Sequence, residues 1–284
     1  MINNKKVVVV TPAGRQRYME LLQHFVVNNS LIDEWQIWQN TNNKSDLKFF
    51  SNLAKIKKNI RLIKIKNISG HYTDIHKFFT YATEPDTVYI RLDDDIVWMG
   101  ENAIENLLNF RIKNPDYFLV FGNIINNAIC DHIHQRMGLL EGLSQVSYAC
   151  FARLGWADGP ACVVKHNRLL DKIKNKKVAE YEFSKWVLNE YERCSINAIC
   201  WFGEDFRDVA KVKIPEEEAY LCHDMPRKLN RYNAICGNSM FSHFAFNPQR
   251  EYMDKTNILK EYKITSKIPD LNFTEDKNQK KFFI

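Results

Sequence analysis

Short apolar runs alternate with stretches of helical periodicity in the first third of the chain, and this order restricts the fold more than any other feature. The spacing of Tyr18, Leu21, Leu22 and Phe25 is typical of an amphipathic helix, and similar stretches separate the later runs. Strand–helix alternation of this kind predicts an α/β fold with a parallel sheet and helices on both of its faces. The apolar runs are Lys5–Val10, Trp35–Trp38, Arg61–Ile65 and Thr87–Leu92.

Composition excludes several classes of protein. With 284 residues, of which 45% are hydrophobic, the chain can bury a core and is not expected to be disordered. The valines of Val7–Val10 are too few for a secretory signal, and no apolar run approaches the ~18 residues of a transmembrane helix. Seven scattered cysteines without a C-x-x-C pair indicate reduced thiols. We therefore expect a cytoplasmic protein whose contact with membranes is at most peripheral.

The net charge of +6 comes largely from lysine clusters. Such clusters either bind nucleic acid or an anionic surface, or are solvated faces of helices. No nucleic-acid motif and no basic stripe with interleaved aromatic residues accompanies the charge. Solvated helix faces are therefore the better interpretation, and we expect no nucleic-acid partner. The oligomeric state cannot be read from the sequence.

Three consecutive carboxylates, Asp93, Asp94 and Asp95, follow the fourth apolar run directly. Like charges this close raise each other's pKa unless a cation neutralises them. Mg²⁺ and Mn²⁺ bind one or two protein carboxylates together with the phosphate oxygens of a substrate. A solvated loop or a helix N-terminus is the alternative. The position after a strand of a parallel sheet favours the metal, because such sheets bind ligands at the carboxyl ends of their strands.

The segment Val88–Asp95 resembles the D-x-D strand end of glycosyltransferases with the GT-A fold, a Rossmann-like and mostly parallel sheet. The resemblance implies that Asp95 binds a metal that bridges the diphosphate of a nucleotide-sugar. It also implies that Asp93 and Asp94 contact the donor or the metal.

The loop after the first apolar run should share the crevice with this acidic turn, because both follow strands of the same parallel sheet. By position, Thr11 and Ala13 are predicted to contact the nucleotide. Arg15 either contacts a base or phosphate or is a solvated residue of the first helical turn, and arginine is well suited to bidentate contact with phosphate.

A second acidic motif, Trp201-Phe202-Gly203-Glu204-Asp205, resembles the W-G-G-E-D segment of the galactosyltransferase branch and the G-E-D segment of family 2 glycosyltransferases. The resemblance implies that Asp205 accepts the proton of the acceptor hydroxyl and that Glu204 binds the acceptor. A placed carboxylate of this kind lowers the barrier to attack by a hydroxyl, and a base opposite the leaving group implies inversion. The alternative is that both residues begin a helix. Phe202 stands where the galactosyltransferases have glycine, and no Gln-x-x-Arg-Trp segment of processive synthases is present.

Many GT-A enzymes complete the metal site with a histidine late in the chain. His243 and His223 are the candidates, and we favour His243, although His223 has a possible orienting carboxylate in Asp224. A lone histidine is more often a satisfied, partly buried residue than a ligand. Trp156, Asp158 and Trp201 are candidates for a sugar-stacking platform, and core packing is the commoner use of tryptophan.

These features together predict a metal-dependent glycosyltransferase of the hexosyltransferase type. It would use Mn²⁺ or Mg²⁺ and a UDP- or GDP-sugar, and would act on a glycan, lipid-linked or protein acceptor. The predicted catalytic domain is 1–250, with a nucleotide-sugar half at 1–125, an acceptor half at 126–250, and a C-terminal tail at 251–284.

Three other functions remain open. Asp93-x-Asp95-x-Val97 fits the nucleophile loop of haloacid-dehalogenase phosphohydrolases, but that loop usually follows the first strand, and here it follows the fourth. A nucleotidyltransferase would need a glycine-rich phosphate loop, and Thr11-Pro12-Ala13-Gly14 has a single glycine. A non-catalytic sugar- or nucleotide-binding module is the third alternative.

Overall fold

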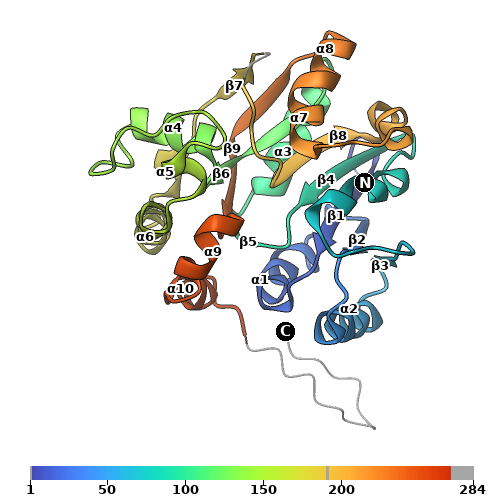
Figure 1. Cartoon of the computed structure of the whole chain (residues 1–284), viewed down its shortest axis with the longest axis horizontal. Helices are drawn as coiled ribbons and strands as arrows, with labels where there is room; N and C mark the ends of the chain where they lie inside the picture. The colour runs from blue at the N-terminus through green and yellow to red at the C-terminus, as the bar shows by residue number, and fades with distance from the viewer. Residues whose placement is uncertain (1, 190–191, 270–284) are drawn as a thin grey trace.

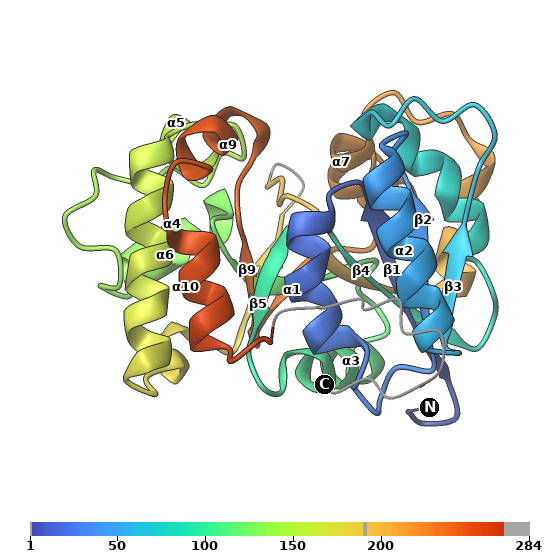
Figure 2. The same cartoon turned by 90° about the horizontal axis from the view of Figure 1, so that it is seen from below.

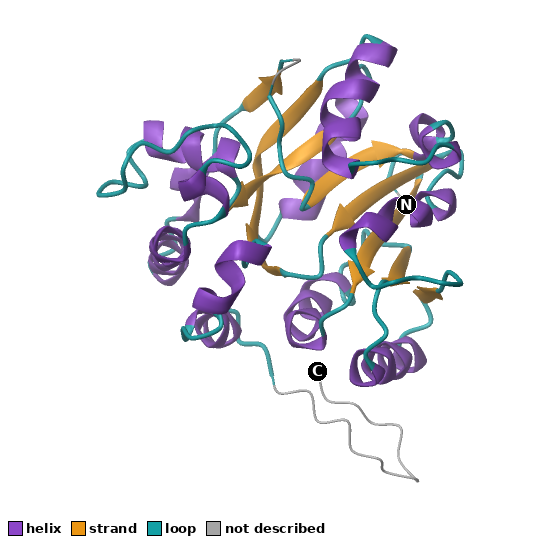
Figure 3. Cartoon of the chain, viewed as in Figure 1, coloured by secondary structure: helices purple, strands orange, loops and turns teal. Residues whose placement is uncertain are grey.

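A computed structural model describes residues 2–189 and 192–269. Within these residues, nine strands form one sheet in the order β3-β2-β1-β4-β8-β6-β9-β5, and β7 joins it by pairing with β9. The sheet runs through the centre of the molecule with helices around it (Figures 1 and 3). The strands are β1 Lys6–Ala13, β2 Glu34–Gln39, β3 Ile60–Ile63, β4 Thr87–Leu92, β5 Ile96–Met99, β6 Val120–Ile125, β7 Lys185–Leu188, β8 Ala198–Phe202 and β9 Asn233–His243.

The helices α1 and α2 lie side by side over one part of the sheet, and α6, α9 and α10 pack together at its other end (Figure 2). A long 3₁₀ helix, η1 (Tyr72–Tyr81), forms the third connection of the first half. The α-helices are α1 Gln16–Val26, α2 Lys44–Ile56, α3 Ala103–Lys113, α4 Ala128–Arg136, α5 Arg153–Trp156, α6 Gly159–Lys174, α7 Glu217–Ala219, α8 Met225–Leu229, α9 Asn247–Met253 and α10 Ile258–Thr265.

The predicted α/β architecture of the first half is confirmed. Strands β3, β2, β1 and β4 are neighbours and run parallel, with Val10 opposite Arg91 in the β1–β4 pair. All four valines of β1 are fully buried, which explains why this strand is a continuous apolar run. The parallel arrangement brings the loop after β1 and the acidic turn after β4 to the same edge of the sheet.

The second half adds strands of both directions. β8 pairs antiparallel with β4, whereas β6 pairs parallel with β9. The sequence pattern of residues 180–191 predicts a helix. That prediction is wrong, because Lys185–Leu188 forms β7 along the edge of β9. An edge strand offers unpaired backbone groups, and pairing with it outweighs a weak helical pattern. Residues 190–191 of that prediction lie outside the described residues.

The segment predicted as a C-terminal tail contributes to the packing as far as the structure describes it. α10 contacts α6, and Tyr262 is fully buried with its hydroxyl 2.8 Å from Nδ1 of His166. Residues 270–284 of the predicted tail lie outside the described residues. Among those described, no helix has the length and apolar character that crossing a membrane requires.

Candidate functional site

A cleft of about 1000 Å³ lies at the carboxyl ends of the parallel strands. The loops after β1, β2 and β4 contribute Gly14, Asn40 and Asp93 to its lining. The second half of the chain supplies the rest of the lining, from the segment before β8, the acidic run at α7 and the end of β9. This is the edge at which an open α/β sheet binds its ligands.

Asp94 ties the acidic turn to the loop after β1. Its Oδ2 accepts hydrogen bonds from the backbone N–H of Gly14 at 2.9 Å and from Nε of Arg15 at 3.2 Å, and Oδ1 also contacts the Arg15 guanidinium. The backbone approaches closely here, because a Cβ added to Gly14 would lie 3.2 Å from the carbonyl oxygen of Asn40. Two segments 79 residues apart thereby form one wall of the cleft.

Asp95 meets His243 because β5 pairs with β9. Ile96 lies opposite His243 in that pair, and the N–H of Phe244 donates to the carbonyl of Asp95 at 2.9 Å. This register leaves Nε2 of His243 3.5 Å from Oδ1 of Asp95. Arg15 and Arg250 approach Oδ2 at 3.0 and 3.6 Å. Burial alone would raise the pKa of Asp95, but Arg15 and then His243 outweigh it and hold that pKa well below its usual value.

Asp93 belongs to a neighbouring ion-pair network. Its Oδ1 accepts from Nε of Arg91 at 2.9 Å, and its Oδ2 accepts from Nδ2 of Asn197 at 3.2 Å. Arg91 also binds Oε1 of Glu217 at 2.7 Å. The phosphohydrolase alternative requires Asp93 as a nucleophile, and both of its oxygens are already hydrogen-bonded within the protein.

Glu217 also lines the cleft, although the sequence did not predict it as a site residue. Burial raises its pKa to about 7; Arg91 opposes that rise and the charge of Asp93 adds to it. A carboxylate with a pKa near neutrality in a cleft is suited to acid–base chemistry. The sequence signal for this residue is Glu216–Glu218, a run of three glutamates that follows Pro215.

The fit of the site to a divalent metal rests on two protein ligands. Within residues 2–189 and 192–269, no group of three or more His, Cys, Asp or Glu side chains could hold a metal ion. Asp95 offers a carboxylate, the protein ligand that suits Mg²⁺ and Mn²⁺, and Mg²⁺ usually completes its coordination with substrate phosphates and water. His243 adds an imidazole nitrogen beside it. The residues present therefore fit a divalent metal for which the protein would supply two ligands.

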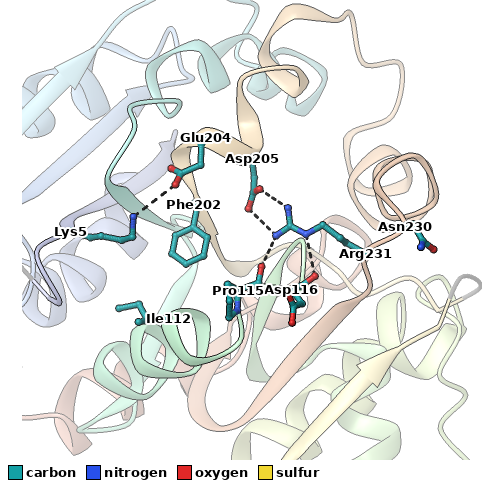
Figure 4. Close-up of a pocket in the computed structure, with 9 residues that line it drawn as sticks. All are labelled: Lys5, Ile112, Pro115, Asp116, Phe202, Glu204, Asp205, Asn230 and Arg231. Carbon is teal, nitrogen blue, oxygen red and sulfur yellow. Dashed lines mark hydrogen bonds and ion pairs between the residues drawn. The ribbon is translucent and has the colours of Figure 1, made fainter.

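The motif at Gly203-Glu204-Asp205 lies elsewhere. β8 runs antiparallel to β4, so Ala198 is opposite Leu92 and Phe202 is opposite Val88. The motif follows Phe202 and is therefore at the amino end of β4, whereas the acidic turn follows its carboxyl end. Glu204 and Asp205 line a second pocket of about 670 Å³ (Figure 4). Their predicted roles as acceptor ligand and base are corrected by this placement.

The contacts that Gly203, Glu204 and Asp205 make around the second pocket give this motif a structural role. Asp205 forms an ion pair with Arg231, whose guanidinium also donates to the carbonyls of Pro115 and Tyr117 at 2.8 and 2.7 Å. Glu204 lies 3.8 Å from Nζ of Lys5. Glycine is required at Gly203, since a Cβ there would lie 2.0 Å from the carbonyl oxygen of Glu84. These contacts join β8 to three other parts of the chain.

We expect the substitution Asp205→Asn to lower stability and to leave ligand binding in the cleft unchanged. It removes the charge that pairs with Arg231, and losing a hydrogen bond between charged, largely buried groups costs about 1–3 kcal/mol. Urea unfolding measures the loss, and nucleotide binding monitors the cleft. Asp208→Asn is the matched control, because its carboxylate is 70% exposed. Loss of sugar transfer with unchanged stability would contradict this structural role.

The other predicted site residues are divided between the cleft and the core. Arg15 and His243 line the cleft. Thr11 and Ala13 are fully buried in β1, where Oγ1 of Thr11 accepts from Nε1 of Trp35 at 3.0 Å, so neither lines it. His223 is not part of the cleft lining either. The predicted contacts of Thr11 and Ala13 with the nucleotide are thus corrected.

Of the three candidates for a sugar platform, Trp156 alone lines the cleft. Trp201 is fully buried and stacks on Tyr89 and Phe206. Asp158 caps α6 by accepting from the N–H of Ala161. Phe151 packs edge-on against Trp156, with ring centroids 5.4 Å apart, and is 57% exposed.

No protein-family model matches the chain, and no curated protein matches it in sequence. Among solved structures, it is similar to a mannosyltransferase from Pyrobaculum calidifontis in complex with GDP-Man and Mn²⁺, with 9% identity and a TM-score of 0.51. The likeness covers 88% of this chain, and the chain spans 59% of the length of that enzyme. It is also similar to a 4-diphosphocytidyl-2C-methyl-D-erythritol synthase from Anaerococcus prevotii, with 10% identity over 93% of this chain and 98% of that one, at a TM-score of 0.44.

The topology and the first of these likenesses agree on the architecture. The four parallel strands from β3 to β4 and the antiparallel β8 beside them form a sheet that is surrounded by helices and has a cleft at one edge. The chain has an α/β fold of the GT-A type, with a Rossmann-like sheet flanked by helices on both faces.

Proposed function

We propose that this protein is a metal-dependent glycosyltransferase that moves a sugar from a nucleotide-sugar to a hydroxyl acceptor. The observation that carries the proposal is the convergence of Asp95 and His243, from different strands, in a cleft that also contains Arg15 and Arg250. A carboxylate and an imidazole suit a divalent metal, and the two guanidinium groups suit the phosphates of a nucleotide.

The donor would be a UDP- or GDP-sugar with Mn²⁺ or Mg²⁺. When bound, the metal would stabilise the negative charge that develops on the diphosphate as the glycosidic bond breaks. Arg15 and Arg250 would contribute to the same stabilisation, since fixed positive groups act most strongly where charge develops. The likeness to a mannosyltransferase in complex with GDP-Man makes GDP the first nucleotide to test.

Glu217 is the carboxylate that we propose as the general base in place of Asp205. It lines the cleft beside Asp93, and its pKa near 7 allows it to accept a proton from a hydroxyl at neutral pH. Arg91 binds one oxygen of Glu217 and would hold the side chain in place. A base opposite the leaving group would give inversion at the anomeric carbon.

The aromatic residues of the cleft support a carbohydrate acceptor. Phe151 and Trp156 lie on one part of its lining, and Tyr72, which is 68% exposed, lies on another. Exposed aromatic faces bind the apolar faces of sugars, and an exposed aromatic cluster in a cleft usually marks a binding surface. A glycan, carried on a lipid or a protein, is the acceptor class that we propose.

The test is thermal unfolding with UDP, GDP and CMP, each with and without Mn²⁺. A nucleotide at 100 times its dissociation constant should stabilise the fold by ~2.7 kcal/mol, which raises the melting temperature by several degrees. The shift should require the metal and should disappear in Asp95→Ala. Asp254→Ala is a control for the loss of a carboxylate outside the cleft lining. The absence of a shift with every nucleotide and metal pair would remove the support for this function.

A further inference from the structure

Asn126 directly follows β6 and is hydrogen-bonded to side chains of three helices, α4, α6 and α9. Its backbone N–H donates to Oδ1 of Asp131 in α4 at 3.1 Å. Its side-chain amide donates to Oε1 of Gln249 in α9 at 2.9 Å, and its side-chain oxygen accepts from Nε2 of Gln249 at 3.2 Å and from Nζ of Lys165 in α6 at 3.3 Å. Asn126 is fully buried, so none of these bonds competes directly with solvent.

The supports of Asn126 are themselves fixed. Lys165 and Asp131 are fully buried and form an ion pair of 2.6 Å, and Lys165 also donates to the carbonyl of Leu154 at 2.6 Å. Oε1 of Gln249 also accepts from the backbone N–H of Phe246. A buried polar network in which each member has several partners holds its geometry firmly.

The backbone of Asn126 is in the left-handed region, with φ of 64°. Asparagine enters this region more readily than most residues, and glycine enters it at little cost. This conformation accompanies an approach of the carbonyl oxygen of Asn126 to Nδ1 of His243, 3.4 Å away. A carbonyl oxygen can only accept, so this contact requires a proton on Nδ1.

We propose that Asn126 is a positioning residue for the metal site. Its carbonyl holds His243 with Nδ1 as the donor, and this leaves Nε2 as the nitrogen that faces Asp95. The ring of Phe246 packs against the imidazole at a centroid distance of 4.4 Å and restrains its rotation from another side. Metal-binding histidines are commonly oriented by a hydrogen bond of this type from the other ring nitrogen. The proposal rests on the proposed function in that it assigns His243 to a metal.

The test combines a ring measurement with a metal titration on the full chain. Nitrogen-15 NMR of histidine-labelled protein, with His243 assigned by comparison with His243→Gln, reports which ring nitrogen carries a slowly exchanging proton. Mn²⁺ affinity is measured separately by electron paramagnetic resonance in the presence of UDP, GDP or CMP, because phosphates would complete the coordination of the metal. The variant is Asn126→Gly, which keeps the carbonyl and tolerates the left-handed backbone but removes the side-chain bonds to Lys165 and Gln249.

We expect the wild type to show a protected proton on Nδ1 of His243. In Asn126→Gly that proton should exchange freely, and the Mn²⁺ dissociation constant should rise about 10- to 100-fold. Asn67→Gly is the matched control, because Asn67 has φ of 58° and is outside the cleft lining. Gln249→Met, which leaves Asn126 itself in place, should produce the same changes in smaller measure and covers the case in which Asn126→Gly does not fold.

The outcomes separate this proposal from the proposed function. A wild type that binds Mn²⁺ with an affinity that neither variant changes would overturn the positioning role alone. A bare Nδ1 in the wild type would overturn it as well. A wild type that binds no Mn²⁺ with any of the three nucleotides, but whose Nδ1 proton is protected and becomes labile in the variants, would overturn the metal function and support the orientation of His243 by Asn126.

Discussion

The substitution Glu217→Gln should lower the rate of sugar transfer by about 10²- to 10⁴-fold, the usual contribution of a general base. Glutamine keeps the size of the side chain and can still bind Arg91, but it cannot accept the proton of the acceptor hydroxyl. Nucleotide and metal binding should change little, because the Asp95–His243 pair is intact. Initial rates at saturating donor and acceptor measure the effect, and the nucleotide-dependent shift in melting temperature checks the donor site.

The pH dependence follows from the raised pKa of Glu217. Activity of the wild type should rise with pH through about 7, since the base acts when it is deprotonated. Stability should change in the opposite direction. The folded state binds the proton of Glu217 more tightly than the unfolded state, so its contribution to stability declines as pH rises from the unfolded pKa of about 4.5 through about 7. Glu217→Gln should remove both dependences.

Glu218→Gln is the matched control for this substitution. Glu218 is adjacent in the same acidic run, but it binds Arg193 at 2.7 Å instead of the Arg91–Asp93 network. We expect Glu218→Gln to retain a transfer rate within about tenfold of the wild type, because Glu218 has no proposed role in proton transfer. Equal loss in the two variants would show that the run acts through structure or charge. Full activity in Glu217→Gln would show that Glu217 is not the general base. The other carboxylates of the cleft would then be the candidates.

The sequence was sufficient to predict the first half of the fold. The buried valines of β1 and the three following strands each carry a local pattern, and parallel pairing of such strands leaves few arrangements. The second half was harder because its strands depend on distant partners. Residues 185–188 form β7 because they pair with β9, and the local sequence does not predict this distant partner.

The position of a site residue could be predicted where it follows from the direction of the strand before it. Asp95 and Arg15 follow parallel strands, so both had to lie at one edge. Asp205 was misplaced because a resemblance in sequence letters says nothing about strand direction, and β8 is antiparallel to β4. The charges of Asp94 and Asp93 are balanced within the protein, because Arg15 pairs with Asp94 and Arg91 pairs with Asp93. The pairing of Arg91 follows from strand alternation, which places Arg91 and Asp93 on the same side of β4.

The second large effect concerns the buried pair of Lys165 and Asp131. We expect Lys165→Met to lower the free energy of unfolding by about 3–5 kcal/mol, because it leaves a carboxylate buried without its partner. Burial already raises the pKa of Asp131, and Lys165 opposes that rise. Without Lys165 the folded state should take up a proton at this site, so the loss should be smaller at pH 5 than at pH 8. Urea unfolding at both pH values measures it.

Two further variants distinguish a charge effect from a packing effect. Lys165→Met with Asp131→Asn removes both charges and should recover a large part of the lost stability, since the cost of a buried pair lies mainly in breaking it. Lys174→Met, in the same helix, should stay within about 0.5 kcal/mol of the wild type, because its side chain is 55% exposed. Equal losses in the single and double variants would mean that Lys165 contributes through its packing. Recovery in the double variant would mean that the pair adds little net stability and that its value lies in fixing Asn126, and through it the imidazole beside Asp95.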